Sequence, residues 1–261
     1  MTISVMLDLE TWGTEPGCDI RSIGACVFDP VTGTVAGDIP HDRKEFFKGG
    51  MLHPGPSAPD NPYWFYIACD NPDVDTYRSS DGRGGYINHP HYGDRYKPKY
   101  PLHRDPRTVQ WWSEQSDKAQ AAFADPVDLS DGLMAFGRWL EGISAEKRID
   151  GPIAGIRIWS HGPAFDPPIL AAAYKAVGLP VPWHYRAPRD TRTCFDMAGI
   201  DDHSAWLEQH PGPLGIPHHA LDDSICQARA VCAATARVRE WADAYAEMQD
   251  VAADARFEDR G

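Results

Sequence analysis

The chain has 261 residues, of which 42% are hydrophobic and 24% are charged. A chain of this size buries enough apolar surface to fold without a disulfide or zinc staple, so we expect residues 1–261 to form a single domain. Its six cysteines include no C-x-x-C pair, which argues against a zinc ribbon and a disulfide framework and predicts buried thiols in a reducing compartment. No basic leader or long apolar run is found, so we expect a cytoplasmic protein with no membrane partner.

The formal net charge is −13, from 25 Lys and Arg against 38 Asp and Glu. This balance argues against a protein that coats nucleic acid through basic side chains and counterion release. It is compatible with an enzyme whose carboxylates converge on divalent cations, because bound cations invert the local charge.

The N-terminal part of the chain is expected to form strands. Two short runs rich in Ile and Val, at residues 2–9 and 21–28, predict strands, the first of them central. Asp29-Pro30 and Thr32-Gly33 predict a hairpin turn. A third strand is then expected within residues 34–47.

Residues 53–105 differ in composition from the rest of the chain. They hold eight of the 23 prolines and seven of the ten tyrosines. Asp81-Gly82 and Gly84-Gly85 are typical of tight turns. We interpret this Pro/Tyr-rich segment as an insertion of loops or short hairpins.

The remaining elements are mostly helices. Residues 108–124, and a segment capped by Ser130 that runs to residue 143, carry apolar side chains at helical spacing. Residues 153–159 are typical of a buried strand. Residues 165–177 and 219–248 predict two further helices, the second of them long. Together these elements describe an α/β domain with a mixed sheet.

Acidic residues stand at points where a strand ends or a helix begins. Asp8 and Glu10 share one face of the first strand, roughly 7 Å apart. Such a pair is tolerated if it is solvated, or if divalent cations lie between the carboxylates. Asp166 begins a helix directly after a strand, where a carboxylate can simply satisfy free backbone amides.

The last helix begins with a Pro-His-His sequence followed by two acids. The helix dipole alone explains Asp222 and Asp223. It does not explain His218 and His219, whereas a general base or a metal site would.

Together the three motifs resemble those of the DEDD superfamily of 3'-5' exonucleases, in its histidine branch (DEDDh). The superfamily patterns hhhDxE, H-x-x-x-F-D and H-x-A-x-x-D read here as residues 8–10, 161–166 and 218–223. Residues 8–14, 111–116, 159–166 and 189–193 further resemble phage DexA-type exonucleases and related bacterial exoribonucleases. The resemblance covers about residues 1–52 and 106–240, and residues 53–105 have no recognised counterpart.

This resemblance implies a ribonuclease H-like fold with a five-stranded mixed sheet flanked by helices. It implies a hydrolase that releases nucleoside 5'-monophosphates from the 3' end of single-stranded RNA or DNA. The implied cofactors are two Mg²⁺ or Mn²⁺ ions, whose charge of +4 would cancel that of four carboxylates. Asp8 would bridge both ions, Glu10 and Asp223 would complete the first site, and Asp166 would hold the second through water. His218 would be the general base.

A sister branch of the superfamily carries a tyrosine at the position of His219. We favour His218 as the base, because four residues separate it from Asp223, as the histidine branch requires. We expect His219 to be structural or solvent-facing and Asp222 to be a helix-start acid. Relatives of this kind are often dimers, so a homodimer is a further expectation.

Candidate substrate-binding residues come from the same stretches and from the insertion. Residues 77–107 contain seven Lys and Arg against three Asp, interleaved with tyrosines. This composition holds single strands without sequence preference, although a solvated loop is the alternative. A second basic group comprises Arg186, Arg189 and Arg192. The candidates are Leu9, Thr11, Trp12, Ser160, His161, Phe165, Arg192, Tyr96 and Lys97.

Two other functions fit parts of the sequence. Residues 5–14 also resemble the start of a haloacid-dehalogenase-type phosphatase, with Asp222-Asp223 as its acidic pair. That family has a second Asp where Glu10 stands, and its pair closes a hydrophobic strand. The non-enzyme alternative is a nucleic-acid-binding module of the exonuclease fold, which the presence of every carboxylate and the histidine disfavours.

Overall fold

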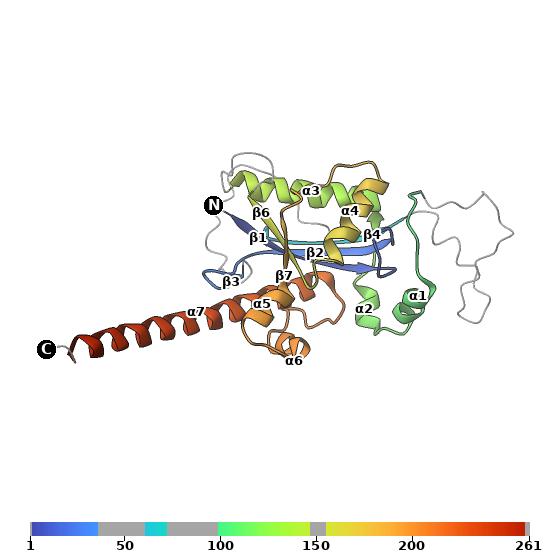
Figure 1. Ribbon diagram of the computed structural model, residues 1–261. Helices are drawn as coiled ribbons and strands as arrows, with labels where there is room; N and C mark the ends of the chain where they lie inside the picture. Colours follow the sequence, from blue (N-terminus) through green and yellow to red (C-terminus); the bar gives the residue numbers. More distant parts are fainter. Residues whose placement is uncertain (1, 36–60, 72–98, 147–154, 259–261) are drawn as a thin grey trace.

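The computed structural model describes residues 2–35, 61–71, 99–146 and 155–258, and Figure 1 shows the course of the chain. The strands are β1 (Ile3–Thr11), β2 (Ile20–Asp29), β3 (Thr34–Val35), β4 (Trp64–Asp70), β5 (Val127–Asp128), β6 (Ile156–Ser160) and β7 (Pro188–Asp190). The helices are α1 (Pro106–Ser113), α2 (Asp117–Ala121), α3 (Leu129–Glu146), α4 (Asp166–Ala176), α5 (Thr191–Met197), α6 (His203–Glu208) and α7 (Ala220–Glu258).

The strands form one mixed sheet in the order β5-β4-β2-β1-β6-β7, with β3 beside β2. β1 is central, antiparallel to β2 and parallel to β6. The predicted mixed sheet flanked by helices is confirmed. The expected number of five strands is wrong, because the described residues form seven, of which β3 and β5 have only two residues each.

Strand β4 corrects the interpretation of residues 53–105 as loops or short hairpins. It lies inside that segment and pairs antiparallel with β2, with Ile67 opposite Ile23. Five of its seven residues are buried. The prolines and tyrosines of residues 53–105 favoured loops in the sequence analysis. Trp64–Asp70 is nevertheless a run rich in aromatic and apolar residues, which are common in strands. Of the strand expected within 34–47, only β3 falls within the described residues.

The predicted helices form with different boundaries. The helix expected at 108–124 is divided into α1 and α2, because the Ser116 side chain accepts from Ala119 N and caps a new helix. Asp128, rather than Ser130, caps α3, since its Oδ1 accepts from Ser130 N at 2.9 Å. The hairpin turn is confirmed by the bond from Gly33 N to Asp29 O. Helices α5 and α6 were not predicted.

Alternation along β1 divides the core into two layers. Val5 and Leu7 pack with α3 and α4 on one face of the sheet, whereas Met6 packs with α5 and α7 on the other. Figure 1 shows these helix pairs on opposite sides of the sheet. Asp8 and Glu10 continue the Met6 face, because side chains alternate along a strand. They therefore point toward the side that α7 covers.

The start of α7 rests directly on the sheet at Gly24. This residue pairs with Asp8 across β1 and β2. A Cβ at Gly24 would lie 2.0 Å from the carbonyl carbon of Ala220 and 2.2 Å from Leu221 N. Only glycine permits this approach, which brings the first turn of α7 next to the carboxylates of β1.

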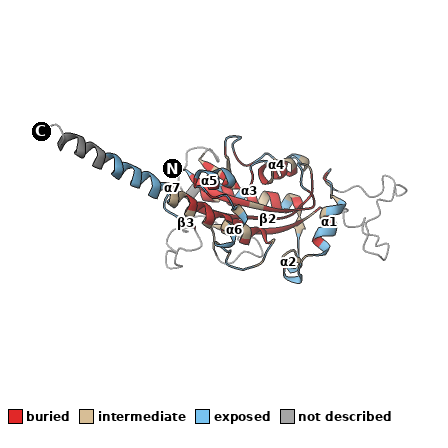
Figure 2. Ribbon diagram, turned by 60° about the horizontal axis from the view of Figure 1, so that its bottom comes forward, coloured by how far each residue is buried: buried red, intermediate tan, exposed pale blue. Residues whose placement is uncertain are grey.

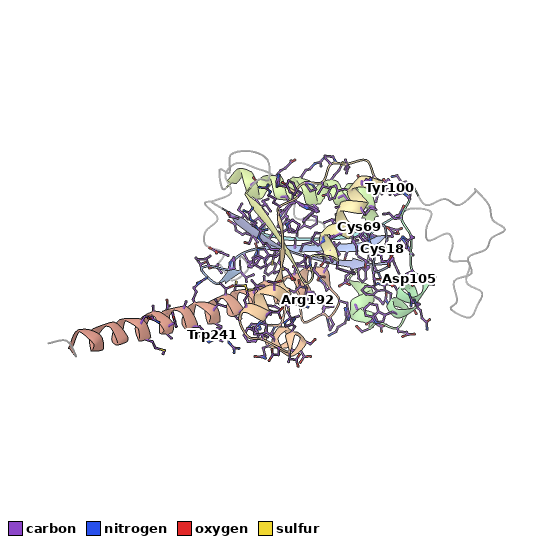
Figure 3. The ribbon with its side chains drawn as sticks, viewed as in Figure 1. Cys18, Cys69, Tyr100, Asp105, Arg192 and Trp241 are labelled. Carbon is purple, nitrogen blue, oxygen red and sulfur yellow. The ribbon has the colours of Figure 1, made fainter. Side chains whose placement is uncertain are left out.

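All six cysteines are free thiols, and four of them are buried, as predicted, whereas Cys194 and Cys226 are half-buried. Cys18 and Cys69 lie inside the domain (Figure 3). No helix in the described part of the chain is long and apolar enough to cross a membrane.

We predict that Gly24→Ala destabilises the protein by about 1–3 kcal/mol or more, because the new methyl group collides with backbone and not with a flexible side chain. Urea denaturation measures this change. Gly137→Ala is the matched control, since a Cβ there meets its nearest atom at 3.7 Å and alanine favours the helix by roughly 1 kcal/mol. Equal stability of the Gly24 variant and the wild type would contradict the packing described here.

Candidate active site

Four carboxylates converge where β1, α4 and α7 meet. Asp8 and Glu10 come from β1, Asp166 is the first residue of α4, and Asp223 lies in the first turn of α7. Leu9 N donates to Asp166 Oδ1 at 3.0 Å, which ties α4 to β1 between the two β1 acids. Glu10 and Asp166 are buried, and Asp8 and Asp223 are half-buried.

Burial and mutual repulsion make these carboxylates reluctant to ionise. Burial, followed by the charges of its acidic neighbours, raises the pKa of Asp8 well above its usual value, and Glu10 behaves alike. Burial likewise raises the pKa of Asp166 and of Asp223 to about 7. Divalent cations would remove this cost, because they compensate the charge and accept carboxylate oxygens as ligands. The donor set therefore fits a site for such ions.

Asp8 is oriented by a residue that the sequence motifs did not include. Gln227 Nε2 donates to Asp8 Oδ1 at 2.7 Å. Gln227 is buried, and its Oε1 has no hydrogen-bond partner among the residues that the structure describes. It lies four residues after Asp223, one turn along α7, so helical spacing from the last motif was the available signal.

His218 stands beside this cluster. Atoms of Glu10, His218 and Asp223 that could bind a metal lie within 4.8 Å of one another. The His218 ring meets the Trp111 ring edge to face, with centroids 4.8 Å apart. Burial lowers the pKa of His218, so the imidazole is neutral near pH 7 and can accept a proton.

His219 has structural contacts instead. It is buried and stacks on Tyr66, with ring centroids 4.2 Å apart. Its Nδ1 accepts from Asp222 N at 3.4 Å. Asp222 accepts from the backbone amides of Leu214 and Ile216 at 2.7 and 2.9 Å, so its carboxylate holds the loop before α7. His219 is therefore structural and not solvent-facing, and Asp222, although it stands at the helix start, binds the preceding loop.

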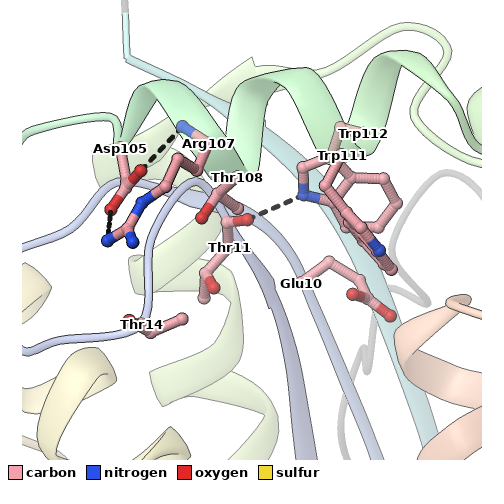
Figure 4. Close-up of a pocket in the computed structure, with 8 residues that line it drawn as sticks. All are labelled: Glu10, Thr11, Thr14, Asp105, Arg107, Thr108, Trp111 and Trp112. Carbon is pink, nitrogen blue, oxygen red and sulfur yellow. Dashed lines mark hydrogen bonds and ion pairs between the residues drawn. The ribbon is translucent and has the colours of Figure 1, made fainter.

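An open cavity of about 540 Å³ adjoins Glu10 (Figure 4). Trp111, which is 40% exposed, and Trp112 line it beside Glu10. Arg107 and Asp105 form an ion pair at the opposite end of the view from Glu10. Trp111 was part of a stretch used for the resemblance but was not among the candidate residues. The remaining lining residues are Thr11, Thr14 and Thr108.

Among the candidate substrate-binding residues near the first motif (residues 8–10), Leu9 and Trp12 lie in the interior. Leu9 belongs to the core under α3 and α4. Trp12 is 6% exposed, with the guanidinium groups of Arg21 and Arg104 each 4.6 Å from its ring. Thr11 is buried, and its carbonyl accepts from Trp112 Nε1 at 2.8 Å. Of these three residues only Thr11 lines the cavity beside Glu10.

The candidate substrate-binding residues near the second motif (residues 161–166) lie in and around the loop between β6 and α4. Ser160 Oγ donates to Gly162 O at 3.2 Å. His161 Nδ1 lies 2.8 Å from Thr191 Oγ1, and burial lowers the pKa of His161 to about 4. Phe165 immediately precedes α4 and packs against the core. Burial raises the pKa of Asp166, and the Arg192 charge partly offsets this rise, which places this cation near the site.

Basic residues at the end of the Pro/Tyr-rich segment have structural partners. Arg104 bridges Asp19 and Asp70 at 3.0 and 2.9 Å. Lys99 pairs with Asp128 at 2.6 Å, and Tyr100 Oη donates to Asp128 at 2.9 Å. Tyr96 and Lys97, with Arg78, Arg83 and Arg95, lie outside the described residues. Arg189 donates to the carbonyls of Arg186, Ala187 and Pro188.

Comparison with known proteins supports the resemblance drawn from the motifs. The family model described as "3'-5' exoribonuclease Rv2179c-like domain" matches residues 3–235. Cell-death related nuclease 4 (CRN-4) is similar with a TM-score of 0.50 at 12% identity, over 89% of this chain and 63% of that chain. This likeness concerns the fold, and it agrees with the expected ribonuclease H-like architecture.

Two structures of exonuclease I are also similar. Each has a TM-score of 0.47 at 13% identity and covers 92% of this chain, with 46% and 43% of the exonuclease chains matched. The chain thus spans less than two thirds of the length of these solved structures. None of the curated proteins matches its sequence.

We predict that Gln227→Leu weakens Mg²⁺ binding by about 10–100-fold, because Asp8 loses the bond that orients it. The Mg²⁺ concentration that produces half of the maximal rise in melting temperature measures this affinity. Gln209→Leu is the matched control, since Gln209 Nε2 donates to Ala205 O on an exposed helix. Unchanged Mg²⁺ affinity in the Gln227 variant would show that Asp8 needs no such partner.

We predict that the metal-free protein becomes more stable as the pH falls from 8 to about 6.5. The folded-state pKa of Asp166 and Asp223 is raised to about 7, so these two carboxyl groups bind more protons in the folded state than in the unfolded state between about pH 4 and 7. Protonation across this window therefore stabilises the fold, by on the order of 1 kcal/mol or more. The lowered pKa values of His161 and His218 oppose this trend below about pH 6.5. Melting in EDTA at several pH values measures the trend, and Mg²⁺ is expected to suppress it. A metal-free protein that gains stability toward pH 8 would contradict this charge arrangement.

Proposed function

The chain belongs to the family of 3'-5' exoribonuclease Rv2179c-like domains, and from this premise we propose that it hydrolyses phosphodiester bonds at the 3' end of single-stranded nucleic acid. The proposal rests chiefly on one observation, the convergence of four carboxylates and His218 beside an open cavity. Nucleoside 5'-monophosphates are the expected products. RNA is the first candidate substrate, because the family description names an exoribonuclease.

Two Mg²⁺ or Mn²⁺ ions are the proposed cofactors, held by Asp8, Glu10, Asp166 and Asp223. When bound, such ions polarise the phosphate and stabilise the attacking and leaving oxygens. The charge of +4 on two such ions would balance the charge of −4 on the four carboxylates, which explains how these side chains can lie close together in a partly buried site. Burial raises the pKa of all four carboxyl groups, and bound cations would favour their ionised form. This supports the assignment of the four residues as metal ligands.

His218 is the proposed general base. Its lowered pKa leaves the imidazole free to take a proton from an attacking water near pH 7. The edge contacts with Trp111 and Trp112 hold the ring beside Glu10 and Asp223. His219 is occupied by Tyr66 and by the first turn of α7, which disfavours it for this role.

The cavity beside Glu10 is the proposed site of the terminal nucleotide. Its volume of about 540 Å³ accommodates one nucleotide. The exposed Trp111 ring offers a stacking surface for a base, and Arg107 offers a cation for a phosphate. Base stacking on an aromatic ring tolerates any sequence.

The alternatives gain no support from the site geometry. The phosphatase needs a free acidic pair, whereas the Asp222 carboxylate is committed to two backbone amides. A binding module would not need His218 beside the acids. We further propose that residues 1–261 act as one domain in the cytoplasm, in line with six free thiols.

We predict that the protein shortens 5'-labelled single-stranded RNA from the 3' end in Mg²⁺ or Mn²⁺. Asp8→Ala and His218→Ala are expected to lower kcat by about 100-fold or more. His184→Ala, a histidine of the loop before β7, is the control and keeps full activity. Matched DNA tests the choice of sugar. Intact RNA and DNA, with metal binding retained, would favour the binding module over the nuclease.

We predict that Trp111→Ala raises KM for oligonucleotides by about 5–100-fold with a smaller change in kcat, because stacking contributes roughly 1–3 kcal/mol per base. Steady-state kinetics on a short single strand measure both constants. Tyr185→Ala, which removes an aromatic ring that is 76% exposed, is the control. An unchanged KM in the Trp111 variant would contradict the proposal that a nucleotide base binds in this cavity.

A further inference from the structure

One side of the open cavity is attached to the domain by few contacts. Residues 106–123, which carry α1 and α2, form this side beside Glu10, and we call them the wall. Only Val109, Trp112 and Ala119 of the wall are buried, and Figure 2 shows exposed residues along both helices. A segment with so few buried contacts opens more easily than the core. Its position therefore depends on the side chains that tie it to the sheet.

Tyr66 of β4 is the first of these ties. Its side chain is buried, and its hydroxyl donates to the carbonyl of Ala122, directly after α2. Burial raises the pKa of Tyr66, so the hydroxyl stays protonated and can donate. The Tyr66 ring also stacks on His219, with centroids 4.2 Å apart and ring planes at 20°. Tyr66 thus links the wall to the segment that carries His218.

Arg21 of β2 is the second tie. Its guanidinium carbon lies 4.3 Å from the centre of the Trp112 ring and 3.7 Å from that of Phe123. Its Nη2 donates to Gln120 Oε1 at 2.7 Å, and Gln120 Nε2 donates to the carbonyl of Trp112. Cation–π contacts are stronger in a buried site than at an exposed one. Arg21 thus joins α1 and α2 to each other and to the sheet.

The wall in turn places two aromatic rings beside the proposed base. Trp111 and Trp112 meet His218 edge to face, with centroids 4.8 and 6.1 Å apart. Trp111 also lines the cavity beside Glu10 (Figure 4). The φ of His218 is 59°, a strained backbone conformation for a residue other than glycine, which persists only where the surroundings hold it. A shift of the wall would therefore disturb both the base and the stacking surface.

We propose that Tyr66 and Arg21 are positioning residues, which hold the wall in the place that the base and the terminal nucleotide require. They act through Trp111 and Trp112. The effect on the reaction rests on the proposed function, whereas the tie between wall and sheet is a property of the fold. The proposal also gives the second histidine of the Pro-His-His sequence a role, because His219 supports the Tyr66 ring from the start of α7.

Removal of one hydroxyl tests the effect on the reaction. Tyr66→Phe is expected to raise KM for a short single strand of RNA by about 5-fold, the size of one hydrogen bond, with a smaller change in kcat. Tyr174→Phe is the matched control, since Tyr174 is buried on the other face of the sheet and its Oη donates to Leu133 O at 2.7 Å. Both variants lose one buried hydrogen bond, and melting temperatures check that both fold. A KM that rises equally in both, or in neither, would overturn the positioning role.

A double substitution shows whether Tyr66 acts through the wall. In the Trp111→Ala background, Tyr66→Phe is expected to change KM by less than about 2-fold, because the stacking ring is already absent. A full additional 5-fold rise, about the effect of one hydrogen bond, would show that Tyr66 acts elsewhere and would overturn the proposal.

Hydrogen exchange tests the tie without a nuclease assay. Tyr66→Phe, and Arg21→Lys, which loses the planar guanidinium, are each expected to speed up amide exchange in residues 106–123 by about 5-fold. Exchange of the wall in Tyr174→Phe is expected to match the wild type. Unchanged exchange in the first two variants would overturn the tie, whether or not RNA is cleaved. Faster exchange supports the tie even if the wild type cleaves no RNA, a result that would contradict only the proposed function.

Discussion

The concentration of negative charge between β1, α4 and α7 is the constraint on which the site depends. Four carboxylates share a partly buried space, and burial raises the pKa of each. Such a cluster is unfavourable by itself and becomes favourable when cations are bound. The local structure holds the acids in place despite their repulsion, through Leu9 N on Asp166 and Gln227 on Asp8. Gly24 contributes by letting α7 approach the sheet.

The sequence was sufficient for features that depend on local periodicity. Alternation along β1 placed Asp8 and Glu10 on one face, and helix starts placed Asp166 and Asp223 at the ends that meet that face. The family match and the mixed sheet confirm the class of protein and the architecture. The site residues themselves remain a proposal, supported by the convergence of their side chains.

Features that depend on distant contacts could not be predicted in the same way. Strand β4 pairs with β2 across a long stretch of chain, and the prolines and tyrosines of the segment around it pointed to loops. The orienting role of Gln227 and the need for glycine at residue 24 arise only when α7 lies on the sheet. Trp12 and Trp111 both lie in stretches that carry the family resemblance. The structure buries Trp12 between two arginines, whereas Trp111 lines the cavity.

Counting the bound ions shows whether these four carboxylates form a metal site. Metal-free protein is titrated with Mn²⁺, and the free ion is measured by electron paramagnetic resonance. Two bound ions per chain are expected, with at least one site lost in Asp8→Asn, because Asp8 lies among all three other acids. Absence of Mn²⁺ binding, or binding unchanged in Asp8→Asn, would contradict a site built on these carboxylates.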